Sequence, residues 1–182
     1  WRPFAKALSS ESNEQESFFK QALNGTCQIV VYASLIAIKR MRLHGYSTEL
    51  VALINTDCEH IKEQSVLGLK PYANGVVIPV YLSCLAACNE SVTVIILREI
   101  GNRNQGQLNS ILFQYLDSQS PDVRMAAIGS LAKLKKPGTL ERLLNVYEAS
   151  NNANEKATVV RALAEFPSLN TSKLLKEALR ST

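Results

Sequence analysis

Apolar side chains recur along this chain in the pattern of paired amphipathic helices. Between Ser120 and Ser150 they fall three or four residues apart in two successive stripes, Val123, Ala127, Leu131 and Leu134, and then Leu140, Leu143, Leu144 and Tyr147. Since an α-helix has about 3.6 residues per turn, each stripe occupies one face of a helix. Neither helix can bury its stripe alone, so we predict that the two pack together as a hairpin.

The first of these stripes is repeated elsewhere in the chain at a step of 31 or 32 residues. Its positions Val123, Ala127, Ile128 and Leu131 have counterparts in three other segments: Ile61, Ser65, Val66 and Leu69; Val92, Ile96, Leu97 and Ile100; and Glu155, Val159, Val160 and Leu163. A fixed period of this length is typical of stacked helical repeats. The pattern therefore predicts a protein built from consecutive helical hairpins.

The predicted helices form two alternating sets. The first helix of each hairpin is expected at Thr26–Met41, Glu59–Lys70, Glu90–Gly101, Pro121–Lys135 and Asn154–Phe166. The second helix is expected at Ser47–Thr56, Gly75–Cys88, Gly106–Asp117, Thr139–Ala149 and Thr171–Arg180. A polar lead-in over residues 1–13 and a short helix over Glu14–Leu23, ending at Asn24-Gly25, precede them.

Residue types at the helix boundaries agree with this assignment. Ser120 before Pro121 combines a good N-cap with proline at the first helical position, where the missing N–H removes no hydrogen bond. Thr139, Asn154 and Thr171 are expected to cap three other helices.

The segment Pro121–Leu131, PDVRMAAIGSL, resembles the inner helix of a HEAT repeat, with Asp and Val-Arg at its start, small residues in its middle and Leu at its end. Pro79, in the first turns of its helix, is similar to the proline that kinks HEAT outer helices. The resemblance extends over residues 26–180 and is strongest in this one segment. The resemblance implies that Arg124 makes a structural contact with the next repeat.

The same resemblance implies an all-α fold, a right-handed α–α superhelix or solenoid of about five HEAT-like hairpins. The hairpins are expected near residues 26–56, 59–88, 90–117, 121–149 and 154–180, within a single repeat domain over residues 14–182.

Composition and charge limit the classes of function. Apolar residues make up 46% of the chain and charged residues 20%, and the whole net charge of +4 lies after Ser118. Nucleic-acid binding usually requires a denser basic stripe with aromatic side chains for stacking, whereas the single Trp here is the first residue. The sequence also shows no nucleophile–base motif and no phosphate-binding loop. We therefore expect no catalytic residues, no cofactor and no metal.

The four cysteines are interpreted as buried free thiols, since all lie within or at the end of apolar helical segments: Cys27, Cys58, Cys84 and Cys88. Free thiols are typical of a reducing compartment, so a cytoplasmic location is expected. Cys84 and Cys88 are four residues apart, a spacing that also allows a zinc site with His44 or His60. Structural zinc sites usually have a second close pair of ligands, which is absent here, so core thiols are the preferred interpretation.

The first residues leave two interpretations open. Trp1 and Arg2 pair an aromatic ring with a cation, as at the interfacial end of a membrane helix. On this interpretation residues 1–13 are juxtamembrane, and the chain is the cytoplasmic domain of a membrane-anchored protein. On the second interpretation, the position of Trp1 at the start of the sequence indicates nothing about a membrane. The apolar segments Ile29–Ile38 and Val76–Cys88 are far shorter than the about 20 residues of a membrane span.

The repeat register identifies a row of candidate partner-binding residues. Arg98 and Arg161 each come one position after the buried pair of their stripe. If the first helices line the concave face, Arg98, Arg161 and Lys70 point into the groove, with Glu63 and Glu165 near them. Helical-repeat proteins usually bind in this groove. The alternative is a solvated face of mixed charge.

Two basic clusters are further candidates for contact with phosphate or an acidic partner. They comprise Lys133, Lys135 and Lys136, and Lys39, Arg40, Arg42 and His44. Both lie at predicted helix C-termini, where cations also interact favourably with the helix dipole. The sequence leaves both explanations open.

These observations together predict a non-catalytic protein–protein interaction scaffold or adaptor that uses the concave face of a HEAT-like solenoid. The alternative is a nucleic-acid-binding HEAT-like protein, DNA-glycosylase-like in its chemistry. A small-molecule or chromophore lyase is a third hypothesis, although no residue marks a ligand pocket. The pattern does not identify the protein partner.

Overall fold

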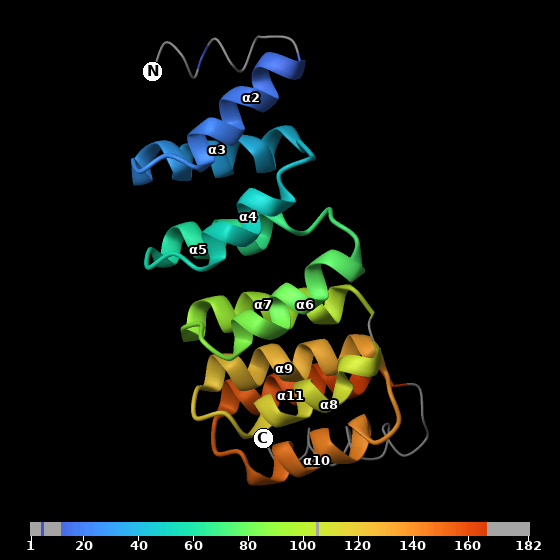
Figure 1. The fold of residues 1–182 in the computed structure, drawn as a ribbon. Coiled ribbons are helices and arrows are strands. Elements are labelled where there is room, and N and C mark those ends of the chain that lie inside the picture. The colour runs from blue at the N-terminus through green and yellow to red at the C-terminus, as the bar shows by residue number, and fades with distance from the viewer. Residues whose placement is uncertain (1–4, 6–11, 105, 167–182) are drawn as a thin grey trace. The chain divides into compact units, whose positions relative to one another are not determined.

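The structure is a computed structural model of the 182-residue chain that describes residue 5 and residues 12–104 and 106–166. Within these ranges the regular elements are α-helices and short 3-10 helices, with no β-strand (Figure 1). The predicted all-α class is confirmed. None of the helices in this part of the chain is long and apolar enough to cross a membrane. The chain divides into two compact units, Trp1–Val92 and Thr93–Thr182.

The N-terminal unit contains two helical hairpins and a helix that precedes them. Its elements are α2 (Ser12–Leu23), α3 (Gln28–Met41), α4 (Ser47–Ile54), α5 (Glu59–Gly68), α6 (Asn74–Leu85) and the first residues of α7 (Glu90–Asn102). α3 packs against α2 and α5, and α4 packs against the same two helices. The core between them includes Phe19, Leu35, Leu50, Val66 and Tyr81.

The C-terminal unit contains the remainder of α7 and the helices that follow it. These are η1 (Gly106–Leu108), α8 (Asn109–Gln114), η2 (Tyr115–Asp117), α9 (Pro121–Leu134), α10 (Thr139–Ala149) and α11 (Ala153–Ala164). α9 packs against α8, η2 and α11, and α10 packs against α11. Ile128, Leu131, Leu143 and Val159 are buried in this core.

All but one of the positions that define the repeat are buried, as the periodicity predicts. This holds for Val123, Ala127, Ile128 and Leu131 in α9, and for their counterparts in α7 and in α5 with its C-cap. In α11 the counterpart of Ile128, Val160, is half-buried, and the counterpart of Val123 is Glu155, which is buried although it is a charged residue. A shared register therefore controls which side chains enter the core, and Glu155 is the position that needs a separate explanation.

Two of the predicted N-caps are wrong, and one is confirmed. The Ser120 Oγ accepts a hydrogen bond from the Val123 N–H at 3.3 Å, with Pro121 at the first helical position. α11 is capped by Asn152 rather than Asn154, because the Asn152 Oδ1 lies within reach of two free N–H groups of the first turn. α10 begins with Thr139 inside the helix, and the residue before it, Gly138, adopts a φ of 79° that favours glycine.

Several predicted helices end earlier than expected, and one is not continuous. α5 ends at Gly68 rather than Lys70, and α6 ends at Leu85 rather than Cys88. Residues 106–117 form a short α-helix between two 3-10 turns instead of one helix. The spacing of apolar residues does not distinguish these states, because 3-10 turns place the same residues on one side and often continue α-helix ends. The proline expected in an outer helix is confirmed, since Pro79 lies inside α6.

The interpretation of the cysteines as four buried free thiols is wrong. Cys84, near the end of α6, forms a disulfide with Cys88, which lies beyond that helix, and their Cα atoms are 5.7 Å apart. The Cys88 N–H donates to the Cys84 carbonyl at 2.9 Å, so a turn after α6 brings the two residues together. Cys27 is exposed and Cys58 is half-buried, since each lies at the N-terminal boundary of a helix rather than within it. The cysteines therefore give no basis for inferring a reducing compartment.

Parts of the predicted organisation lie outside the described residues. The expected helix over Thr171–Arg180, together with its Thr171 cap, is among them. The lead-in over residues 1–13 lies largely outside them too, and its last two residues belong to α2. The single repeat domain over residues 14–182 stays a prediction, because the two compact units are each defined by their own contacts.

A close approach between α7 and α9 depends on a glycine. A Cβ atom added at Gly101 would lie 2.7 Å from the Cα of Ser130, closer than real side chains come to backbone. The Ser130 Oγ donates a hydrogen bond to the Leu97 carbonyl at 2.7 Å, so a second contact fixes the same spacing. Gly129, one residue earlier in α9, would place an added Cβ in open space.

These two glycines predict opposite effects of the same substitution. Gly101→Ala should lower the free energy of unfolding by about 1–3 kcal/mol, because the backbone of α9 must move away. Gly129→Ala should raise it by roughly 0.5–1 kcal/mol, because alanine has the higher helix propensity and meets no neighbour. Urea denaturation followed by circular dichroism measures both. Equal stability of the two variants would show that α7 and α9 are not in this close contact.

Candidate functional site

Three of the predicted binding residues belong to the C-terminal unit. Arg98 on α7 and Arg161 on α11 are both exposed, Arg98 after the buried Leu97 and Arg161 after the half-buried Val160. The Arg161 Nε donates to the Ala157 carbonyl of its own helix at 3.2 Å, so its side chain lies along α11. Glu165 caps the C-terminus of α11 and forms an exposed ion pair with Lys135 at 3.2 Å. Surface ion pairs of this kind contribute little to stability and leave both groups accessible.

The other two predicted residues, Lys70 and Glu63, belong to the N-terminal unit. Lys70 is exposed and follows the end of α5. Glu63 is half-buried on α5 and accepts a hydrogen bond from the Ser91 hydroxyl at the start of α7. Glu63 therefore has a structural role between two repeats. The use of all five residues as one binding surface stays a prediction, because they are divided between the two units.

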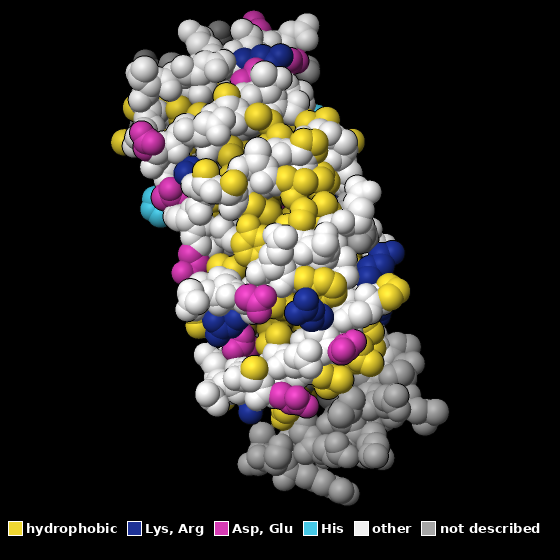
Figure 2. Space-filling view, turned by 60° about the horizontal axis from the view of Figure 1, so that its bottom comes forward, with side chains coloured by type: hydrophobic (Ala, Val, Ile, Leu, Met, Phe, Trp, Pro, Cys, Tyr) yellow, Lys and Arg dark blue, Asp and Glu magenta, His cyan; other side chains and the backbone are white. Residues whose placement is uncertain are grey.

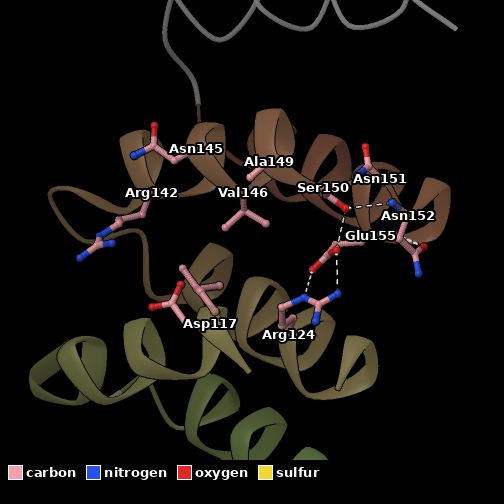
Figure 3. Close-up of a pocket in the computed structure, with 11 residues that line it drawn as sticks. Asp117, Arg124, Arg142, Asn145, Val146, Ala149, Ser150, Asn151, Asn152 and Glu155 are labelled. Carbon is pink, nitrogen blue, oxygen red and sulfur yellow. Dashed lines mark hydrogen bonds and ion pairs between the residues drawn. The ribbon is translucent and has the colours of Figure 1, made fainter. Parts of the chain in front are cut away.

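Sequence reasoning missed a cavity of about 630 Å³ in the C-terminal unit (Figure 3). Its wall is formed by the end of η2, the N-terminal turn of α9, one face of α10 and the loop that leads into α11. The polar residues that line it include Asp117, Arg124, Arg142, Asn145, Asn151 and Glu155. Loops between helices supply much of this lining, which is why a search for apolar stripes did not find it.

A buried ion pair forms the inner wall of this cavity. The Arg124 Nε is 2.5 Å from Glu155 Oε1, and a second guanidinium nitrogen donates to Oε2 at 3.0 Å. Arg124 also donates to the carbonyls of Ser118 and Gln119, and the Ser150 hydroxyl donates to Glu155 at 2.6 Å. The contact from Arg124 to the next repeat, implied by the HEAT resemblance, is therefore present, because α9 and α11 belong to consecutive repeats.

These hydrogen bonds explain how a carboxylate can occupy a core position. Glu155 is 2% exposed, and a buried charge is tolerated only when it is paired and its oxygens are hydrogen-bonded. The hydrogen bond from Arg124, aided by that from Ser150, holds the pKa of Glu155 below its ordinary value despite burial. The same partner raises the pKa of Arg124. Both groups are therefore ionised at neutral pH, and they hold α11 in register with α9.

The outer part of the cavity is polar and accessible. Figure 3 shows Arg124 and Glu155 directed toward each other, while Arg142 and Asn145 extend away from the pair. Arg142 lies over the ring of Phe113 at 5.7 Å, which fixes its guanidinium at the edge of the cavity. No histidine or cysteine is among the described residues that line it. The arrangement offers hydrogen-bond donors and acceptors to a bound chain but no nucleophile with an adjacent base.

A second cavity, of about 530 Å³, lies in the N-terminal unit between the C-terminal ends of α3 and α5. Lys39, Arg42 and His44 of the predicted basic cluster line it, and Lys70 joins them from the other helix. Arg40 is exposed but does not line it. The basic side chains of Lys39, Arg42 and His44 therefore lie in a concave site, next to apolar side chains that line the same cavity.

The Arg124–Glu155 pair predicts a specific dependence of stability on pH. Because the pKa of Glu155 is lowered by folding, its carboxylate stabilises the native state above the ordinary carboxyl pKa of 4.5, and this contribution is lost as the pH falls through the lowered value. Glu155→Gln should lower the free energy of unfolding by roughly 1.5–3 kcal/mol at neutral pH. The difference from wild type should shrink at acidic pH.

Urea denaturation at neutral pH and at about pH 3.5 measures this difference. Glu141→Gln, an exposed glutamate on α10, is the matched control and should behave like wild type at both pH values. A destabilisation by Glu155→Gln that stays constant between these pH values would contradict the assignment of the carboxylate as the stabilising form.

Comparison with known proteins agrees with this architecture. A family model for HEAT repeats matches residues 78–164, from within α6 to the end of α11. A designed armadillo repeat protein of known structure is similar at a TM-score of 0.53, with 20% sequence identity over 88% of this chain and 86% of that chain. Comparison with curated proteins found no match. At this identity the structural likeness concerns the fold alone. The chain therefore has a HEAT/armadillo-like helical repeat fold.

Proposed function

We propose that this protein is a non-catalytic scaffold or adaptor that binds another protein through the exposed face of the first helices of its repeats. Helical repeats of the HEAT and armadillo kind commonly serve as protein-interaction scaffolds, because stacked hairpins present long continuous surfaces. The finer assignment, to a concave face that contains Arg98, Arg161, Lys70, Glu63 and Glu165, is part of the proposal.

The observation that carries the proposal is the recurrence of exposed charge at one register position. Arg98 on α7 and Arg161 on α11 occupy equivalent positions and are exposed, while the residues just before them are buried (Leu97) or half-buried (Val160). Exposed arginines at these positions do not disturb the packing of the core and remain accessible to a partner. In the view of Figure 2, which is not restricted to the first helices, hydrophobic side chains lie next to positive and negative ones. Mixtures of this kind also occur in protein-binding surfaces.

We also propose that the protein is located in the cytoplasm. A scaffold in the cytoplasm, free or tethered by a segment before Trp1, would recruit its partner there. Fractionation of cells that express the natural full-length protein, with or without alkaline extraction of membranes, distinguishes a tethered from a free form. Recovery of the protein outside the cytoplasm would contradict both.

Charge reversal at the repeated position tests the binding face. In the Arg98→Glu/Arg161→Glu variant the free energy of unfolding should change by less than about 0.5 kcal/mol, because both side chains are exposed. Capture from a nuclease-treated lysate of the source organism should then show a protein that wild type retains and this variant loses. The Arg98→Lys/Arg161→Lys variant keeps the positive charge at both positions and should still retain it.

Two results would contradict the proposal. Equal retention by all three proteins would place the binding site away from the first-helix face. Retention that disappears when the lysate is treated with nuclease would instead favour the nucleic-acid alternative.

A further inference from the structure

We propose that the cavity between the C-terminal ends of α3 and α5 binds an acidic, amphipathic segment of a partner protein. This inference rests on the proposed function as a scaffold and adds the chemistry of the partner. The cavity holds Lys39, Arg42 and Lys70 together with apolar side chains, and no carboxylate is among the described residues that line it. A site with this lining complements negative charge combined with hydrophobic groups.

The charges of the two cations from α3 are not neutralised within the described chain. The Lys39 Nζ donates to the Gln64 Oε1 at 2.6 Å, a neutral acceptor that orients the ammonium group without cancelling its charge. Neither Lys39 nor Arg42 forms an ion pair with a residue that the structure describes. A bound carboxylate would therefore gain charge-assisted hydrogen bonds without displacing an existing ion pair.

Helix capping accounts for these cations only in part. Two of the last four carbonyls of α3, those of Ile38 and Lys39, already accept hydrogen bonds from the backbone N–H groups of Leu43 and Arg42. These two carbonyls therefore need no hydrogen bond from the side chain of Lys39 or Arg42. The helix dipole favours a cation there, but it does not explain why Lys70 approaches the same cavity from the end of a second helix.

The C-terminal unit provides an internal comparison. Lys135 occupies the position at the end of α9 that Arg42 occupies at the end of α3, with left-handed φ values of 48° and 53°. Lys135 pairs with Glu165, the residue that caps α11 in the following repeat. At the corresponding end of α5 the chain has Leu69 followed by Lys70. Glu165 thus neutralises Lys135 at the end of α9, whereas no carboxylate is among the described residues that line the cavity at the end of α3.

The walls of the cavity are held in place by contacts outside it. The Tyr46 N–H donates to the Tyr72 Oη at 2.9 Å, which ties the loop after α3 to the loop after α5. The rings of His44 and Tyr72 meet edge to face, with centroids 6.3 Å apart. A site that exists before its ligand arrives avoids part of the entropic cost of ordering on binding.

Apolar surface leads from this cavity along α3. In the described part of the chain, four of the five large hydrophobic side chains that are exposed belong to this one helix: Ile29, Val30, Tyr32 and Met41. Ile29 is 69% exposed and Tyr32 40%, and their spacing places these two on the same side of α3 as Ile36 and Lys39, whereas Val30 and Met41 lie on another side of the helix. Scattered exposed hydrophobics need no explanation, whereas a clustered set marks an interaction surface.

The cavity and this stripe together specify the partner. A helix of 14 residues is about 21 Å long, so the ligand spans roughly four helical turns or a shorter extended segment. Its apolar residues pack on the stripe, and its Asp or Glu residues enter the cavity at one end. An anionic lipid surface and a phosphorylated peptide share part of this chemistry, and the experiment below separates them from the proposed acidic segment.

Selection from a random peptide library tests the proposal without an identified partner. A displayed library of peptides about 16 residues long is selected on the intact wild-type protein and counter-selected on the Lys39→Glu/Arg42→Glu variant. The expected sequences have apolar residues at spacings of three and four and clustered Asp or Glu at one end. Circular dichroism first establishes that the variant has the helical content and melting temperature of wild type.

Fluorescence anisotropy with the most enriched peptide, labelled with fluorescein, then measures affinity. Binding should weaken at least tenfold, about 1.4 kcal/mol, in Lys39→Glu/Arg42→Glu and about threefold or more in Ile29→Ser. The charge-preserving variant Lys39→Arg/Arg42→Lys should bind within about threefold of wild type. Replacement of the peptide's Asp and Glu by Asn and Gln should weaken binding as strongly as charge reversal of the protein.

Each of the following outcomes would overturn the proposal. The first is a selection that enriches no peptide, or only peptides without acidic residues. The second is equal binding of the enriched peptide by wild type and all variants. Phosphatidylserine vesicles could bind in a manner that depends on Lys39 and Arg42 while no peptide is enriched, which would assign the site to lipid. A phosphoserine version of the peptide that binds more than tenfold tighter would assign it to phosphate. Failure here leaves the test at Arg98 and Arg161 unaffected, so the two proposals can fail separately.

Discussion

The fold depends on one constraint, that the first helix of each repeat has an apolar stripe too wide to be covered by its own hairpin. α9 shows this most clearly, because Val123, Ala127 and Leu131 are buried and α9 packs against α8 of the repeat before it and α11 of the repeat after it. The close approach at Gly101 and the bond from Ser130 to the Leu97 carbonyl follow from the same requirement. Because the apolar stripe of each first helix is buried against neighbouring helices, the remaining surface of the helix is exposed to solvent. Arg98 and Arg161 lie on this exposed surface.

The predictable part of the fold is the part governed by this periodicity. The stripe positions in α5, α7 and α9 and most helix starts could be predicted because burial acts at every third or fourth residue. The capping of α11 by Asn152 rather than Asn154 could not, since both residues are suitable caps and only the local backbone decides between them. The same limit applies to the Cys84–Cys88 disulfide, because the spacing of four residues fits both a bond and two free thiols on one helix face.

The candidate sites differ in how far the sequence reveals them. The repeat register predicts which side of a helix each residue occupies. It therefore correctly predicted that Arg98 and Arg161 are exposed. Both cavities involve the ends of helices and the loops between them, where residues far apart in sequence meet without a fixed period. The basic cluster at Lys39 and Arg42 was visible as composition, but the approach of Lys70 was not. A glutamate in a stripe position, as at Glu155, was the one signal in the sequence for the buried ion pair.

The Arg124–Glu155 pair also has a consequence for the order in which the chain is completed during synthesis. Its two residues are 31 positions apart, so α9 and the whole of α10 are synthesised before the carboxylate. Until then the guanidinium has only the Ser118 and Gln119 carbonyls, which carry no compensating charge. The C-terminal unit therefore reaches its final register only after α11 has emerged, and a chain interrupted before Glu155 retains an unneutralised cation between its repeats.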